Sequence, residues 1–330
     1  MGSLLSLLLP FFALVLIGWV AARRGLLPVE GIGALMVFVL YFALSALLFR
    51  LGASGRLHAG PVWGLLAVYA LSSVAVTLVG LWCARRSGLS RPDAGMVALV
   101  AAFPNTGFLG LPLLTGLLGP QAAGPVAATL LVDVILTCSA CVAWIHADGA
   151  GGQGALAALR ASLRGALRNP LLQAMAAGLL VAALGWTVPP AVDETLRLLG
   201  QAATPAALFT LGAIVARAQL RARALGATSQ PAASARPGVR RAVLLKLVAH
   251  PLLVWLMGLG LAAVGHPLPD LGLAAVTLAA ALPAAANVSM LAEREGADTG
   301  LIARVILWTT VGSVVSLLVW SAVLGVQQAV

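Results

Sequence analysis

Long apolar runs separated by short polar breaks fill most of this chain. Each run extends for about 20 residues, which is the length that an α-helix needs to cross the hydrocarbon core of a bilayer. Because that core offers no water to backbone groups, such spans satisfy their own hydrogen bonds as helices. The pattern predicts an all-α polytopic membrane protein with ten transmembrane helices, at residues 3–22, 31–49, 61–83, 94–118, 121–146, 170–188, 200–218, 242–265, 270–291 and 301–325.

A stretch rich in Gly, Ala and Arg divides the ten spans into two sets of five. We expect a first five-helix repeat over residues 1–147, a cytoplasmic connecting loop over 148–169 and a second five-helix repeat over 170–330. A chain that crosses the membrane five times ends on the side opposite to where it began. The second set of five helices therefore has the opposite orientation in the membrane to the first. A 5+5 inverted repeat is typical of secondary transporters. This inference depends on the count, since an error of one helix would remove the inversion.

Composition and charge limit the classes of molecule that the protein is expected to bind. Hydrophobic residues make up 61% of the 330 residues and charged residues 9%, against about 25% charged in soluble domains. The net charge of +10 comes from short basic bursts between apolar runs, so we expect no nucleic-acid partner. Membrane lipid and a small organic anion are the expected partners. The sequence does not decide whether the chain forms a homodimer.

Basic residues concentrate on one predicted side of the membrane. The loops after the odd-numbered spans hold sixteen of the twenty Lys and Arg residues, and the opposite side holds Arg50, Arg56 and Arg197. By the positive-inside rule, both termini lie outside a cytoplasmic (plasma or inner) membrane. Residues 219–241, which contain Pro and many Arg residues, are expected to form a flexible cytoplasmic loop facing anionic lipid headgroups.

Two spans at matched positions of the repeats contain prolines near mid-membrane. The fourth span carries Pro104 and Pro112, and the ninth carries Pro283 followed by Asn287. Proline lacks the N–H of a helical bond, so nearby carbonyls lose their partners. A simple kink in a packed helix explains either span alone. Interrupted helices at matched positions of two repeats, however, point to a transporter's binding site.

A carboxylate fits such a pair of breaks. Half-helix N-termini carry partial positive charge and free N–H groups, and asparagine amides and hydroxyls add further donors. Lys246 either neutralises the substrate carboxylate or extends to the inner interface. The candidate substrate-binding residues are Pro104, Asn105, Thr106, Gly107, Pro283, Asn287, Ser289 and Lys246.

Two further ionisable residues within spans are candidates for proton or ion coupling. Asp133 lies near the middle of the fifth span, where desolvation disfavours its charged form, so a coupling proton could bind there. The alternative is a structural acid, paired with a cation or capped by hydroxyls such as Thr129 or Thr137. His250 shares a helix face with Lys246 and is either a proton relay or a hydrogen-bonded helix residue. The four histidines have no metal-ligand spacing. We expect no metal, and no cofactor beyond a coupling proton or sodium ion.

The string from Phe103 to Pro112, Phe-Pro-Asn-Thr-Gly-Phe-Leu-Gly-Leu-Pro, closely resembles the signature of the auxin efflux carrier family, in its bacterial malonate- and malate-permease-like branch. Residues 169–172, 205–213 and 283–287, together with Lys246 and Pro251, support the resemblance, which spans the whole chain. It implies a fold similar to bile-acid symporters and sodium/proton antiporters, with helices 4 and 9 crossing at their proline breaks beside an organic carboxylate. The residues it indicates are Pro104, Asn105, Pro283 and Asn287.

Two departures from the plant members argue against auxin itself as substrate. The chain lacks their long hydrophilic central loop and has Phe-Pro-Asn-Thr-Gly where they tend to carry Asn-Pro-Asn-Thr. The function predicted from the sequence is secondary transport of small mono- or dicarboxylates, such as malonate or malate, by alternating access. A membrane sensor that binds the same anions without flux is the alternative. A membrane-embedded enzyme is less favoured, because no HExxH or acidic metal cluster is present, and we predict no catalytic residue.

Overall fold

The computed structural model describes residues 2–28, 30–54, 62–147, 170–224 and 235–326, and residues 157, 160, 164, 167 and 168 between them. Every regular element in these ranges is a helix. Six are long and apolar enough to cross a membrane: Gly31–Ala53, Trp63–Arg86, Pro120–Ile145, Pro190–Arg217, Gly238–Ala263 and Thr299–Val323. Four further apolar helices are shorter: Leu9–Arg23, Thr106–Leu118, Pro170–Ala183 and Asp270–Ala281. The prediction of an all-α polytopic membrane protein is confirmed.

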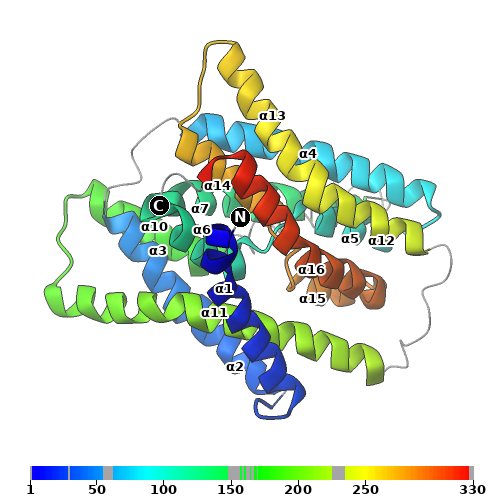
Figure 1. The fold of residues 1–330 in the computed structure, drawn as a ribbon, viewed down its shortest axis with the longest axis horizontal. Helices are drawn as coiled ribbons and strands as arrows, with labels where there is room; N and C mark the ends of the chain where they lie inside the picture. Colours follow the sequence, from blue (N-terminus) through cyan, green and yellow to red (C-terminus); the bar gives the residue numbers. More distant parts are fainter. Residues whose placement is uncertain are drawn as a thin grey trace. The chain divides into compact units, whose positions relative to one another are not determined.

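Several spans combine α-helix with a wider π-helical turn, written η, and η4 is a short 3₁₀ turn. Most of the α-helices are labelled in Figure 1. The elements of the first half are α1 (Gly2–Arg23), α2 (Gly31–Val37), η1 (Phe38–Ala43), α3 (Leu44–Ala53), α4 (Val62–Arg86), α5 (Arg91–Ala102), η3 (Thr106–Gly110), α6 (Leu111–Leu118), η4 (Pro120–Ala122), α7 (Ala123–Leu131), η5 (Val132–Cys138) and α8 (Ser139–Ile145). Those of the second half are α10 (Pro170–Ala183), α11 (Pro190–Ala224), α12 (Ala235–Leu244), η7 (Leu245–Ala249), α13 (His250–Ala263), α14 (Asp270–Ala281), α15 (Val288–Arg294) and α16 (Thr299–Val323).

The chain forms two compact units, and each unit takes segments from both halves of the sequence. The first unit comprises Met1–Gly60, Gly107–Gly124 and Gly165–Leu220. The second unit comprises Pro61–Thr106, Pro125–Arg164 and Arg221–Val330. The second unit therefore contains Pro104 and Pro283 of the predicted helix breaks and the ionisable residues of the fifth and eighth predicted spans, whereas Pro112 belongs to the first unit.

Glycines allow close helix contacts in the first unit. Helices α3 and α10 pack against each other, and a side chain at Gly52 or Gly178 would collide with the backbone of the other helix. Likewise, a Cβ atom at Gly212 of α11 would overlap the carbonyl oxygen of Val15 in α1. Small residues of this kind let transmembrane helix backbones approach closely where no hydrophobic effect drives association.

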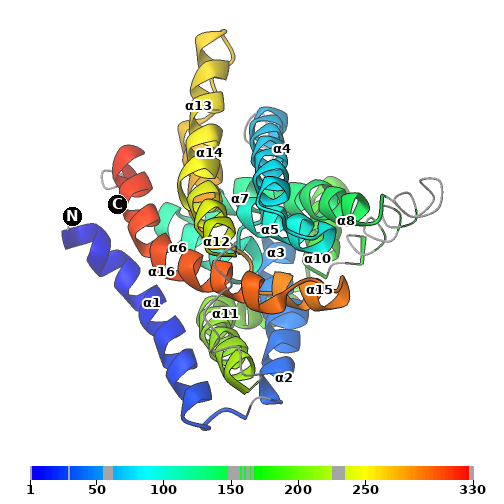
Figure 2. The same cartoon turned by 90° about the vertical axis from the view of Figure 1, so that its right-hand side faces the viewer.

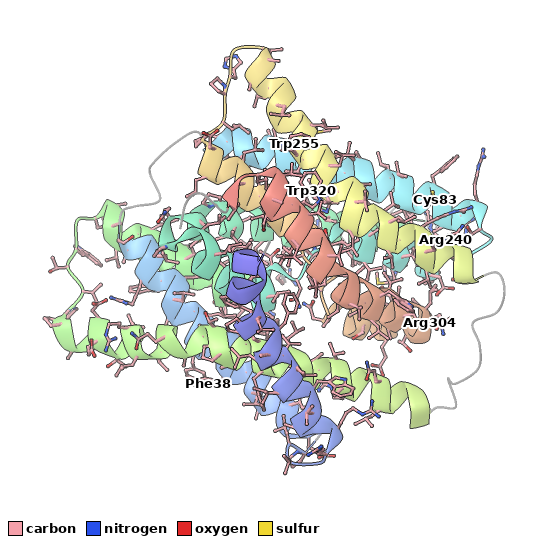
Figure 3. All side chains as sticks on the ribbon, viewed as in Figure 1. Phe38, Cys83, Arg240, Trp255, Arg304 and Trp320 are labelled. Atoms are coloured by element: carbon pink, nitrogen blue, oxygen red, sulfur yellow. The ribbon has the colours of Figure 1, made fainter. Side chains whose placement is uncertain are left out.

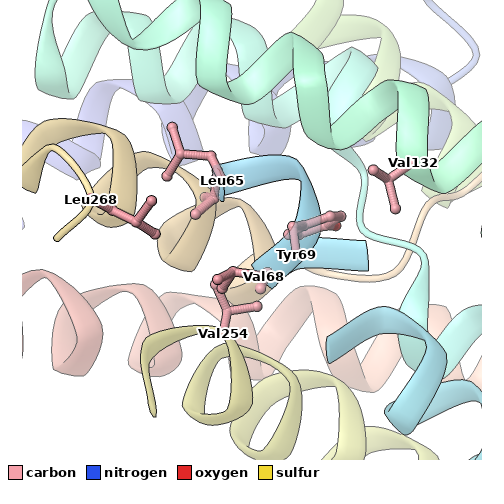
Figure 4. Close-up of a cluster of buried hydrophobic side chains, with 8 residues drawn as sticks. Leu65, Val68, Tyr69, Val132, Val254 and Leu268 are labelled. Carbon is pink, nitrogen blue, oxygen red and sulfur yellow. The ribbon is translucent and has the colours of Figure 1, made fainter. Parts of the chain in front are cut away.

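The second unit has an apolar core around α4. Helix α13 packs against both α4 and α14 (Figures 1 and 2). Two aromatic rings join α13 to α16, where Trp255 and Trp320 meet edge to face with ring centroids 5.9 Å apart (Figure 3). The buried cluster at the centre is drawn in Figure 4 and consists of Leu65, Val68, Tyr69, Val132, Val254, Leu268, Val276 and Ala280. Tyr69 is the one member of this cluster with a polar side chain.

Helix boundaries differ from the predicted spans where charges or prolines intervene. Helix α11 begins at Pro190, ten residues before the predicted span 200–218, because Pro suits the first helical turn and Asp193 favours a helix N-terminus. The carboxylate of Asp193 pairs with Arg50, at 2.7 Å. A hydropathy pattern misses this charged first turn, since it contains few apolar residues.

The two predicted loops are described only in part. Of the loop expected over 219–241, residues up to Ala224 continue α11 and residues from Ala235 belong to α12, and 225–234 lie outside the described residues. Most of the connecting loop expected over 148–169 also lies outside the described residues.

Candidate functional site

The fourth and ninth predicted spans are both interrupted, and their interruptions lie side by side in the second unit. Helix α5 ends at Ala102 and helical structure resumes at Thr106. Helix α14 ends at Ala281, and α15 starts at Val288. Between them, Pro104 and Ala284 form an isolated antiparallel bridge. The helix breaks predicted at Pro104 and Pro283 are therefore present, whereas Pro112 lies within the helical segment Thr106–Leu118 and interrupts nothing there.

Each break supplies hydrogen-bond partners that the other lacks. The N–H of Asn105 donates to the carbonyl of Pro283 at 2.8 Å, and the N–H of Ala285 donates to the carbonyl of Phe103 at 3.1 Å. In a continuous helix these N–H groups would bond to carbonyls four residues earlier in their own spans. The proline rings prevent continuation of both helices. Two breaks in contact are thus more stable than either break alone, because buried backbone groups need partners.

Side chains satisfy one further pair of backbone groups at the second break. A continuous helix would join the N–H of Ala284 to the carbonyl of Ala280. Instead, Ala284 N donates to Thr309 Oγ1 in α16 at 3.2 Å, and Ala280 O accepts from Lys246 Nζ in η7 at 2.6 Å. Both Thr309 and Lys246 are fully buried. The ammonium group thus takes the place of a missing helical hydrogen bond.

Asp133 lies in a buried polar network of the same unit. Its carboxylate accepts from the hydroxyl of Tyr69, 3.0 Å from Oδ1 and 3.2 Å from Oδ2, and from Thr106 Oγ1 at 3.5 Å. The donors to Asp133 are thus Tyr69 and Thr106, in place of the Thr129 or Thr137 considered from the sequence. A buried carboxylate needs such partners to remain charged.

His250 extends this network along α13. Its Nε2 atom lies 3.2 Å from Ser73 Oγ, and its Nδ1 atom lies 3.5 Å from Lys246 Nζ. Its ring also packs against that of Tyr69, with centroids 5.4 Å apart. The histidine is fully buried. The hydrogen-bonded role considered from the sequence is therefore observed, and a relay role stays a prediction.

Three π-helical turns carry the polar residues of this network. Thr106 begins η3, Asp133 is the second residue of η5, and Lys246 is the second residue of η7. A π turn inserts one extra residue into an α-helix and changes the direction of the neighbouring side chains. Such turns occur frequently at functional sites. Their coincidence with these buried polar residues marks the region as the candidate site.

The two asparagines have different surroundings. The side chain of Asn105 is 3% exposed, and no group among the described residues accepts a hydrogen bond from its Nδ2 atom. Asn287 is exposed and precedes α15 without a side-chain capping bond. Ser289 donates to the carbonyl of Ala286 at 2.8 Å. Gly107 follows Thr106 and belongs to the first unit.

Comparison with known proteins identifies the family. The model of a family described as "Membrane transport protein" matches residues 3–152 and 153–321. The chain belongs to this family of auxin efflux carriers.

Relatives named as transporters cover between 63% and 98% of the chain. A Rhizobium meliloti protein named "Putative malonate transporter" is 31% identical over 95% of this chain and 93% of its own length. An "Uncharacterized transporter" of Methanothermobacter thermautotrophicus is 27% identical, over 98% and 99%. The Escherichia coli "Uncharacterized transporter YfdV" is 24% identical over 63% of this chain and 68% of its own length. The protein is thus an integral membrane protein of a transporter family.

Three residues of the carrier's network were missed by sequence reasoning. Tyr69, Ser73 and Thr309 are fully buried polar residues within long apolar helices. Tyr69 is one of only two tyrosines in the chain, which was the available signal. Hydroxyl residues are otherwise common in membrane helices, where they bond to their own backbone, as Thr77 does to Ser73 O. Only tertiary contacts distinguish a hydroxyl that joins the buried network from one that bonds to its own helix backbone.

Proposed function

We propose that this protein is a secondary transporter that carries small organic anions, mono- or dicarboxylates such as malonate or malate, by alternating access. The observation that carries the proposal is the amide of Asn105, which is buried beside two interrupted helices while its Nδ2 donor has no partner among the described residues. A buried donor without a partner is unfavourable by about 1–3 kcal/mol. A substrate carboxylate would satisfy it.

The surroundings of Asn105 favour a negatively charged substrate. The helical segment that begins at Thr106 directs its N-terminus, with its partial positive charge and free N–H groups, toward the break. The Nζ atom of Lys246 adds a further buried hydrogen-bond donor to the same network. We assign substrate contact to Lys246 and to residues of the two breaks: Pro104, Asn105, Thr106, Gly107, Pro283, Asn287 and Ser289. The printed name of the Rhizobium meliloti relative, which mentions malonate, agrees with this substrate class.

The architecture that we propose for transport is a 5+5 inverted repeat of ten spans with α5 and α14 crossing at their breaks. The paired breaks in the fourth and ninth predicted spans support it. Both termini lie outside the cytoplasmic membrane in this proposal, on the basis of the loop charges. Alternating access would expose the site to each side of the membrane in turn.

Proton coupling is assigned to Asp133 and His250 in this proposal. Both are fully buried, and Tyr69 connects them, since its hydroxyl donates to Asp133 and its ring packs against that of His250. A carboxylate in low dielectric binds a proton readily unless its partners hold the charge. A substrate anion that approaches this network would disfavour the charged form of Asp133. Substrate and proton could then be carried together.

A flux screen in proteoliposomes tests the proposal. Malonate, malate and lactate are offered to vesicles containing the full chain, with imposed proton or sodium gradients, and uptake is compared with empty vesicles. Transport predicts uptake of at least one acid. Saturable binding without uptake would instead indicate a sensor, and conversion of the acid would indicate an enzyme. The relatives are named as transporters, which favours uptake.

A further inference from the structure

A small pocket lies between the C-terminal end of α4 and helix α12 in the second unit. Its lining is apolar except for Arg241, and includes Cys83 and Ala84 of α4, Val97 of α5, Ala242 of α12 and Leu245 of η7. Cys83 and Leu245 are half-buried and Arg241 is exposed, so the pocket reaches the surface. Figure 3 labels Cys83 and Arg240 at this end of the unit.

Four exposed arginines surround this pocket and form what we call the basic cluster: Arg85 and Arg86 at the end of α4, and Arg240 and Arg241 in α12. Neither helix contains an acidic residue. The acid nearest to α4 in the sequence, Asp93, accepts hydrogen bonds from Ser90 Oγ and from the N–H of Asp298. Within the described ranges, none of the four arginines forms an ion pair with a carboxylate. The positive charge of the cluster is therefore available to an anion from outside the chain.

Contacts with residues 82–89 hold three of these guanidinium groups at the end of α4. The Cζ atom of Arg86 lies 4.6 Å from the ring centroid of Trp82, and Arg85 Nη1 donates to the carbonyl of Leu89 at 3.1 Å. From α12, Arg241 Nη1 donates to Ser87 Oγ at 2.9 Å. A guanidinium group carries five N–H donors in a planar fork, so each group keeps donors for another partner. Such forks match the oxygens of a phosphate group.

The neighbouring face of α4 is one that lipid would cover. Leu78 and Val79 are exposed apolar residues one turn before the pocket, and the exposed ring of Trp82 follows them. Tryptophan rings of membrane proteins collect at the level of the lipid headgroups. The pocket thus lies where an apolar, lipid-facing surface meets the basic cluster. Basic pockets between transmembrane helices on the cytoplasmic side bind anionic lipid headgroups, and the loop charges predict that this end of α4 is cytoplasmic.

We propose that the pocket and the basic cluster bind one anionic phospholipid, with its phosphate at Arg86 and Arg241 and an acyl chain along Cys83 and Leu245. This site goes beyond the proposed transport function and does not depend on which substrate is carried. A zwitterionic lipid is disfavoured, because its ammonium group is repelled by the cluster. The apolar lining favours a lipid over free phosphate, which has no apolar surface to bury there.

Thermal unfolding of the purified full chain is the first test. The midpoint is measured in detergent micelles that contain either dioleoyl phosphatidylglycerol, which is anionic, or dioleoyl phosphatidylcholine, which is zwitterionic. A ligand that binds only the folded protein raises the midpoint by mass action, and we expect the anionic lipid to raise it by about 2 °C or more above the zwitterionic one. An equal wild-type midpoint in the two lipids overturns the proposal.

Paired substitutions locate the effect on the protein. Arg86→Gln combined with Arg241→Gln should remove the difference between the lipids, because each arginine near an anionic surface contributes about fivefold in affinity. The matched control is Arg23→Gln combined with Arg24→Gln in the first unit, where Arg23 stacks on Trp19 with Cζ 4.7 Å from the ring centroid. This control should keep the difference. A full lipid response in the folded Arg86 and Arg241 double variant overturns the proposal.

The thiol of Cys83 reports occupancy of the pocket in the wild-type protein, so this second test does not require any variant to fold. The protein is treated with a maleimide in the same micelles, and labelling of the Cys83 peptide is followed by mass spectrometry, apart from that of Cys138 and Cys141. Phosphatidylglycerol should slow the labelling of Cys83 at least about threefold relative to phosphatidylcholine, by mass action. Inorganic phosphate added to the phosphatidylcholine micelles should give no protection. Equal labelling in the two lipids, whatever its rate, or protection by phosphate alone, overturns the proposal.

Discussion

The hydroxyl of Tyr69 donates to the carboxylate of Asp133, with its oxygen 3.0 Å from Oδ1 and 3.2 Å from Oδ2, and both side chains are fully buried. This contact joins α4 to η5 within the second unit. It places a neutral donor against the one acid that lies deep in the network. The stability and the chemistry of the site both depend on it.

Removing that hydroxyl should destabilise the protein. Hydrogen bonds to charged groups contribute about 1.5–3 kcal/mol in soluble proteins and average about 0.6 kcal/mol between membrane helices. We expect Tyr69→Phe to lower the free energy of unfolding by about 1–2 kcal/mol, measured by thermal unfolding in detergent. The control is the same substitution in an Asp133→Asn background. There, Tyr69→Phe should lower the free energy of unfolding by less, because its charged partner is already gone. Equal losses in both backgrounds would show that the contact contributes nothing of its own.

Replacing the acid should change coupling without abolishing movement of substrate. Asn at position 133 is close in size to Asp but cannot take up a proton. We expect Asp133→Asn to lose the response of malonate uptake to an imposed pH gradient, while exchange of malonate for malonate continues. Asp270, an exposed acid in the first turn of α14, is the matched control, and Asp270→Asn should keep the response. An unchanged pH response of Asp133→Asn would exclude this residue as the coupling group.

Close helix contacts in the first unit give a prediction about stability alone. A methyl group at Gly212 of α11 would overlap the carbonyl oxygen of Val15 in α1, whereas one at Gly260 of α13 meets nothing within 4 Å. Overpacking usually destabilises by about 1–3 kcal/mol. Gly212→Ala should therefore lower the unfolding temperature, while Gly260→Ala should leave it unchanged or raise it slightly, because Ala favours helix. An unfolding temperature of Gly212→Ala equal to that of the wild type would show that α1 and α11 do not approach closely at Gly212.

The sequence predicts the helix class and the positions of the breaks because both depend on local chemistry. Span length follows from apolar runs, and a proline interrupts its own helix whatever surrounds it. The charged start of α11 was missed because hydropathy does not register Asp193 and its neighbours. The two compact units could not be predicted from the midpoint of the sequence, since each combines segments of both halves.

Side-chain partners in the network depend on tertiary packing, which no local pattern encodes. Lys246 was predicted as a charge near the site, but its bond to Ala280 O requires η7 to pack beside the end of α14. Tyr69 and Thr309 were missed for the same reason. Asn105 was selected for its amide, and only the structure shows that its Nδ2 atom is buried without a partner among the described residues. The roles of the substrate-binding residues stay predictions.

Malonate uptake by Asn105→Ala, in vesicles matched for protein content with the wild type, tests the central claim most directly. Because Nδ2 of Asn105 makes no hydrogen bond within the described structure, its removal should leave the unfolding temperature nearly unchanged. The wild type should accumulate malonate or a related acid, and the folded Asn105→Ala protein should lose at least about 90% of that uptake, which corresponds to about 1.4 kcal/mol of binding energy. Uptake by folded Asn105→Ala at the wild-type rate would contradict a carboxylate site at the paired helix breaks.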